Sequence, residues 1–197
     1  MGASTVTLDR REPRRSKPLI SNGVMGMLLF VFTEAMLFAG LISAHIIFMS
    51  GQVGQLWPPP GQPRLPFAET AVNSAALMVS GGILLLSHLA FRVDPRRALI
   101  PLGMAVALGA FFVGFQGMEW LGLLREGLTL RSSTYGAFFY LIVGAHALHA
   151  VAAITCLGWA WARLKQGVLT DTEFKTVQVF WYFVVLVWPM IYFQVYL

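Results

Sequence analysis

Long apolar stretches alternate with short polar segments along the chain. A transmembrane helix needs about 20 residues to cross the hydrocarbon core. None of the stretches shows the alternation over about 10 residues that marks the strands of a membrane barrel. The pattern therefore predicts an all-α integral membrane protein, a bundle of five transmembrane helices in a single domain, residues 20–197. The five stretches are 22 to 28 residues long and cover residues 24–49, 68–91, 99–124, 135–162 and 176–197.

Lys and Arg residues concentrate on one side of the predicted membrane. Eleven of the 14 lie within the first 17 residues, after the second stretch or after the fourth. Because short cytoplasmic segments are enriched in Lys and Arg, we expect the N-terminus inside, the C-terminus outside, and a basic cytoplasmic arm at residues 1–19. The first stretch exceeds the apolar core of about 7–15 residues in a signal peptide, so we do not expect it to be cleaved.

Composition agrees with this assignment. The chain is 57% hydrophobic and 12% charged, whereas soluble domains carry about 25% charged residues. The net charge of +5 is explained by membrane topology and anionic lipid, and we expect no nucleic-acid partner. The single cysteine, Cys156, excludes a disulfide within the chain, and we expect it to be a buried packing residue.

One carboxylate, Glu34, lies in the middle of the first stretch, which has no other acid and no Lys or Arg. Because an ionisable residue at this depth is costly, we expect Glu34 to face the bundle interior and hydrogen-bond to a neighbouring helix. Two interpretations stay open. The bond is purely structural, or Glu34 exchanges protons beside a partner that carries a cofactor.

Small and polar residues form two stripes on the second stretch. Members of each stripe are seven residues apart, which is nearly two helical turns. Such residues permit close packing of helices in lipid, so we expect both stripes to face other helices. The first stripe is Asn73, Ser80 and Ser87, and the second is Ser74, Gly81 and His88.

Two polar pairs occur one turn apart on the third and fourth stretches: Gln116 with Glu119, and His146 with His149. Residues at this spacing share a helix face. We expect the two histidines to hydrogen-bond to Glu34 and Glu119 across helices.

Histidines also suggest a metal or haem site. His45 and His88 lie near opposite ends of their helices, too far along the membrane normal to share one ion with the central pair. A two-histidine metal site completed by Glu34 or Glu119 is the weaker alternative. We therefore expect no catalytic, cofactor-binding or metal-ligating residue in this chain.

Several short motifs follow one another in a characteristic order. They are TEAMLF at 33–38, WPP at 57–59, Asn73 with Ser80-Gly81 and His88, Gly114 with Gln116 and Glu119, Gly144 with His146 and His149, and Trp181, Phe183, Val187 and Trp188 followed by Val195-Tyr196. In this order and spacing the chain resembles subunit III of the haem-copper terminal oxidases, in the short five-helix form, from about residue 20 to the end.

The chain departs from the pattern of that family at four positions. Tyr182 stands where the family usually has His, and Val185 where it has Asp. Val143 replaces a customary Thr, and Ala147 a Gly. The resemblance therefore implies a divergent branch, without any role that the usual His and Asp pair carries.

The resemblance implies a noncatalytic subunit that binds no haem or copper, packs against the catalytic subunit I with subunit II nearby, holds phospholipid and supports proton uptake in aerobic electron transport. We expect haem and copper in those partner subunits, a possible respiratory supercomplex, and a multi-pass protein of the bacterial plasma membrane. Two alternatives remain. One is a small proton-coupled transporter, and the other is an accessory subunit of a quinol oxidase or a nitric oxide reductase.

Overall fold

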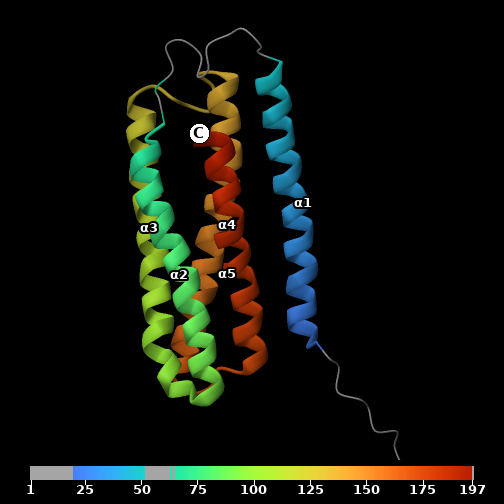
Figure 1. The fold of residues 1–197 in the computed structure, drawn as a ribbon, viewed down its shortest axis with the longest axis vertical. Coiled ribbons are helices and arrows are strands. Elements are labelled where there is room, and N and C mark those ends of the chain that lie inside the picture. The colour runs from blue at the N-terminus through green and yellow to red at the C-terminus, as the bar shows by residue number, and fades with distance from the viewer. Residues whose placement is uncertain (1–19, 52–62, 64, 197) are drawn as a thin grey trace, which may run out of the picture.

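Five long helices make up most of the described chain. The computed structural model describes residues 20–51, 63 and 65–196, and these contain no strand. All five helices are long and apolar enough to cross a membrane, which confirms the predicted five-helix bundle (Figure 1). In chain order the elements are α1 (Asn22–Ser50), α2 (Phe67–Val93), the 3₁₀ turn η1 (Pro95–Ala98), α3 (Leu99–Arg125), α4 (Thr134–Lys165), α5 (Asp171–Ile191) and the π-helical turn η2 (Tyr192–Tyr196).

The fifth helix starts earlier than the hydropathy pattern predicts. The first four helices match the predicted stretches to within three residues, but α5 begins at Asp171 rather than at residue 176. Thr170 caps it, because its hydroxyl accepts from the backbone N–H of Glu173 while the Glu173 carboxylate accepts from the backbone N–H of Thr170. This capping box satisfies two backbone donors, so the helix extends beyond the apolar stretch into polar sequence.

The helices run side by side along the long axis of the molecule, and α1 lies at one edge (Figure 1). Sequence neighbours α2 and α3 pack as an antiparallel pair, as do α4 and α5. Helix α1 instead packs mainly on α5, the last helix of the chain. The core therefore lies where α5 meets α2, α3 and α4.

The first small-residue stripe of α2 faces another helix, as predicted, and that helix is α3. The Ser80 hydroxyl donates to the backbone carbonyl of Ala105 at 2.8 Å, and the Ser87 hydroxyl to that of Ala98 at 3.2 Å. The Asn73 amide donates to the carbonyl of Phe112 at 3.2 Å. Short side chains let the two backbones approach closely enough for these bonds, as expected for helix packing in lipid.

The second stripe of α2 faces α5. The Trp188 indole N–H donates to the Ser74 hydroxyl at 2.7 Å. A Cβ at Gly81 would lie 3.1 Å from a methyl group of Val185, so this contact needs a very small residue. The His88 ring lies 6.2 Å from the Phe174 ring. The two stripes therefore place α2 between α3 and α5.

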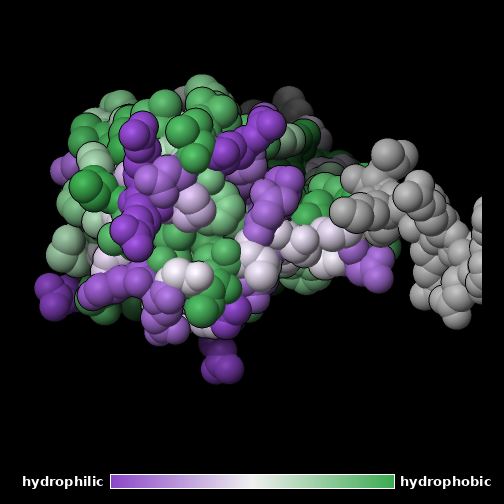
Figure 2. Space-filling view, turned by 90° about the horizontal axis from the view of Figure 1, so that it is seen from below, coloured by the Kyte–Doolittle hydropathy of each residue, from purple (hydrophilic) through white to green (hydrophobic). Residues whose placement is uncertain are grey.

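The end of the bundle where α2 and α4 end and α5 begins is polar. Figure 2 shows this end, with hydrophilic residues spread across it. Arg163 pairs with Glu173 at 3.2 Å and Lys175 with Asp171 at 2.6 Å. This end is the one predicted to face the cytoplasm, and that orientation stays a prediction. The basic arm at 1–19 and the WPP segment at 57–59 lie outside the described residues.

Cys156 is only half-buried, on the side of α4. The expectation that Cys156 is fully buried is therefore wrong, whereas its expected packing against apolar neighbours is found. The residue borders the apolar core rather than filling it, because α4 exposes part of that face.

Candidate functional site: two interhelical polar clusters

The first polar cluster joins α1 to α4. Glu34 Oε2 lies 3.0 Å from Nε2 of His149, which is the predicted hydrogen bond between helices. The other ring nitrogen, Nδ1, lies 2.7 Å from the backbone carbonyl of Ala145. A carbonyl only accepts, so Nδ1 carries a hydrogen. The contact between Nε2 and Oε2 then holds one proton, either on the carboxyl group or on the ring.

Aromatic rings surround this pair and limit its contact with solvent or lipid. The His149 ring lies 5.5 Å from Phe38 and 6.0 Å from Phe183. The side chains of His149 and Glu34 are 13% and 20% exposed. The pair therefore combines a structural link between helices with a proton that it can share, and both interpretations of Glu34 remain compatible with the geometry.

His146 does not make the bond to a carboxylate that the sequence predicted. Its side chain is buried among Phe38, Phe112 and Trp188. Its Nε2 has no hydrogen-bond partner among the described residues. The expectation was wrong because depth in the membrane does not fix the direction of a side chain around the helix: one turn separates His146 from His149, yet it points toward α5 and α3.

The second polar cluster lies near the end of the bundle where α2 begins and α3 ends, and it joins α2, α3 and η2. The Thr70 hydroxyl lies 3.1 and 3.0 Å from the two carboxylate oxygens of Glu119. The Gln116 amide donates to Glu119 at 2.8 Å and to the Tyr196 hydroxyl at 3.1 Å. Asn73 lies at the edge of the cluster, with its amide 3.5 Å from the Gln116 carbonyl oxygen. These bonds tie the end of the chain to the α2–α3 pair.

The sequence did not lead us to expect two members of the second cluster, Thr70 and Tyr196. Thr70 lies one turn before Asn73, so the two residues share a face of α2. The spacing could therefore have predicted that Thr70 extends the first stripe. Tyr196 could not be placed from sequence, because its position depends on the change from α-helix to π-helix at Tyr192.

The two clusters are separate. Glu34 and His149 belong to one, and Gln116 and Glu119 to the other. A transporter path through both carboxylates would need a network that links them. Among residues 20–51, 63 and 65–196, no hydrogen bond joins the two clusters, and no group of three or more His, Cys, Asp or Glu side chains is arranged to hold a metal ion.

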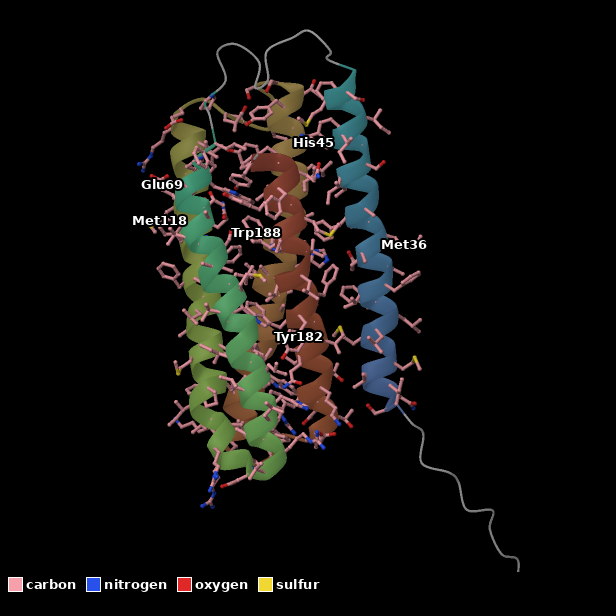
Figure 3. All side chains as sticks on the ribbon, in the orientation of Figure 1. Met36, His45, Glu69, Met118, Tyr182 and Trp188 are labelled. Carbon is pink, nitrogen blue, oxygen red and sulfur yellow. The ribbon has the colours of Figure 1, made fainter. Side chains whose placement is uncertain are left out.

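The remaining histidines are packing residues within the described chain. His45 is buried, and its ring lies 5.5 Å from Phe138. His88 packs beside Phe174, as noted above. Tyr182, at the position where the resembled family has His, is half-buried on α5 (Figure 3), and its hydroxyl has no partner in the part of the chain that the structure describes.

A cavity of about 200 Å³ lies between α3 and α4 and reaches α5. Phe112, Gln116 and Gly117 line it from α3, and His146 and Ala147 from α4. The Trp188 ring closes its inner end, and Figure 3 shows Trp188 inside the bundle. Neither Glu34 nor Glu119 lines the cavity.

Comparison with known proteins identifies the family. The family model described as cytochrome c oxidase subunit III matches residues 15–197. The chain is 28% identical to cytochrome c oxidase subunit 3 of Pelomedusa subrufa, and 29% identical to those of Cyprinus carpio and Oncorhynchus mykiss. Each alignment covers 91% of this chain and 71% of the relative.

The match covers the described helices and both polar clusters. It agrees with the order of motifs and with a five-helix membrane bundle. The chain belongs to the cytochrome c oxidase subunit III family and is a noncatalytic, multi-pass membrane subunit of a haem-copper oxidase.

Proposed function

We propose that the chain binds in the membrane to a catalytic subunit I, with subunit II in the same complex, and that these partners carry the haem and copper. In this proposal it stabilises subunit I, helps to hold phospholipid, and supports proton uptake during aerobic electron transport. The observation that carries the proposal is the family match over residues 15–197. Because the relatives are animal proteins, they do not test the location in a bacterial plasma membrane. That location, with the N-terminus inside, therefore belongs to the proposal as well.

The surface of α1 supports docking. Within this chain, only 11% of the most apolar 18-residue segment of α1 is buried. Ala35, Ala39 and Ser43 follow one another at four-residue spacing and are all exposed. Stripes of small residues let transmembrane helices pack closely, so this face of α1 suits a helix of subunit I. Figure 3 shows Met36 pointing outward from the same helix.

The Glu34 and His149 pair supports the role in proton uptake. It lies between α1 and α4 and holds one shareable proton in surroundings that are mostly aromatic. A carboxyl group and an imidazole within hydrogen-bond reach of each other are among the groups that transfer protons in proteins. We place it beside the proton entry of the neighbouring subunit rather than in a path through this chain.

Purification of the tagged chain in mild detergent tests the proposal. We expect subunits I and II to co-purify and the complex to show haem absorbance. The isolated chain should show none. A spectrum of b-type haem alone with a nitric-oxide-reducing activity, or turnover with quinol, would favour the accessory-subunit alternatives. Recovery of the chain without any haem-containing partner would overturn the proposal.

A matched pair of variants tests the docking face. Ala39→Leu places a large side chain in the exposed stripe of α1, and Ala75→Leu makes the same change at an exposed position of α2. We expect Ala39→Leu to reduce co-purification of subunit I and Ala75→Leu to leave it unchanged. Equal recovery in both variants would show that α1 is not the docking helix.

A further inference from the structure

The cavity between α3 and α4 touches the second polar cluster at Gln116 and contains no residue of the first. We infer that it holds the end of a hydrocarbon chain from a membrane lipid, inserted sideways between the two helices. The inference concerns a site within this chain and does not depend on which oxidase subunits bind it.

The cavity opens on the apolar side of the bundle. Gly117 is exposed and Ala147 half-buried at its mouth, whereas Phe112, His146 and Trp188 at its inner end are buried. Both mouth residues lie well inside helices α3 and α4, far from the polar end in Figure 2. A molecule that enters here comes from the hydrocarbon region rather than from water.

The wall of the cavity is apolar. Three of the lining residues carry polar groups, namely Gln116, Trp120 and His146. The Gln116 amide already bonds to Glu119 and Tyr196. His146 Nε2 and Trp120 Nε1 are buried beneath the wall rather than exposed on it. A water molecule needs about 2–4 polar partners, and a dry engineered cavity of about 150 Å³ takes benzene rather than water. The cavity of about 200 Å³ therefore suits a hydrocarbon.

Packing supplies the driving force. A lipid chain gains little hydrophobic free energy by leaving other lipid chains. An empty cavity, however, deprives its lining atoms of van der Waals partners. A chain end that fills the space restores those contacts for Val113 and Trp120, which line the cavity and are only half-buried.

The rim favours lipid over a helix of another subunit. Met118 and Leu148 flank the mouth and are 62% and 70% exposed, and Met118 points away from the bundle in Figure 3. Close helix contacts in membranes use small residues on both sides. Long, exposed aliphatic side chains on both helices are instead typical of a surface that faces lipid.

Photolabelling of the intact complex tests the inference. The complex is reconstituted into nanodiscs that contain phosphatidylcholine with a diazirine at the end of one acyl chain, and labelled residues are mapped by mass spectrometry. We expect label on the wall residues Val113, Gly117 and Ala147. Competition with unlabelled phosphatidylcholine or with a polyprenyl alcohol then tells whether an acyl or an isoprenoid chain is preferred.

Two glycines on α3 give a matched pair of variants. A Cβ at either Gly117 or Gly114 would meet nothing within 4 Å, but only Gly117 lines the cavity. In Gly117→Leu we expect label on Ala147 to fall about tenfold, because a close-packed interior does not hold both the new side chain and the lipid. In Gly114→Leu we expect no change.

Several results would overturn the inference. One is even labelling of all exposed positions on α3 and α4, unaffected by Gly117→Leu. Another is ordered water, or a side chain of a neighbouring subunit, filling the cavity in a density map of the complex. Recovery of the complex is measured separately, and if Gly117→Leu fails to assemble, the position of the label in the unmodified complex decides. A failure to co-purify with an oxidase would contradict the proposed function instead.

Discussion

Gly109, near the middle of α3, lies against two other helices at once. A Cβ built there would lie 2.5 and 2.8 Å from two ring carbons of Trp181 on α5, and would also contact Cδ1 of Ile154 on α4. Real Cβ atoms essentially never approach other atoms below 3.0 Å. Gly109→Ala therefore forces Trp181 or α3 to move. Gly114→Ala is the control, since nothing lies within 4 Å of its Cβ.

The distances set the size of the effect. Carbon atoms pack best at about 3.5–4.0 Å, so Trp181 must shift by about 1 Å to accept the methyl group. Trp181 is 0% exposed, and overpacking of such a core costs about 1–3 kcal/mol. Alanine also favours a helix over glycine by about 0.8–1.0 kcal/mol, but this gain is common to both variants. The difference between them therefore measures the overpacking alone.

Thermal denaturation of the purified complex measures this difference. At about 2–4 °C per kcal/mol for a chain of this size, we expect the chain to dissociate or unfold about 2–12 °C lower in Gly109→Ala than in Gly114→Ala. Adding Ile154→Val to Gly109→Ala removes one contacting atom and should recover part of the loss. Equal midpoints for the two alanine variants would show that α3 does not pack on Trp181 as described.

Substitutions at three further positions test the polar contacts by the same assay. Glu34→Gln keeps a donor for His149 and should leave stability nearly unchanged, whereas Glu34→Ala should cost about 1–3 kcal/mol; a larger loss in Glu34→Gln would contradict the hydrogen bond. Thr70→Val removes the hydroxyl bonded to Glu119 while keeping its shape, and should cost about 1–3 kcal/mol, so an unchanged midpoint would count against the second cluster. Trp188→Phe should cost about 1–3 kcal/mol through the lost N–H bond and the space it leaves; a stable variant would show that the ring is not locked in place.

The faces of α2 were predictable from sequence because helical geometry is fixed. Residues seven apart share a face whatever surrounds them. Ser80 and Ser87 therefore had to point the same way, and small hydroxylated residues indicated a helix contact. Which helix they would meet was not predictable, since spacing along one helix says nothing about the order of helices around the bundle.

The same limit explains the errors at the polar sites. The positions of His146 and His149 in the sequence predicted their depth in the membrane but not the direction of each side chain around the helix axis. The bond expected from His146 to a carboxylate therefore proved wrong. Glu34 found its predicted partner because His149 happens to face α1. The early start of α5 escaped prediction for another reason: hydropathy locates the membrane boundary, whereas the hydrogen bonds of Thr170 locate the helix boundary.

The packing of α1 on α5 has a consequence for biogenesis. Helix α1 is synthesised some 120 residues before its main partner, α5. Until then its contact within the chain is with α4, through Glu34 and His149, and lipid or another protein covers the rest of its apolar surface. A nascent chain cut short before α5 would thus leave α1 held to the other helices mainly by Glu34 and His149, and open to capture by an insertase or to removal by membrane proteases.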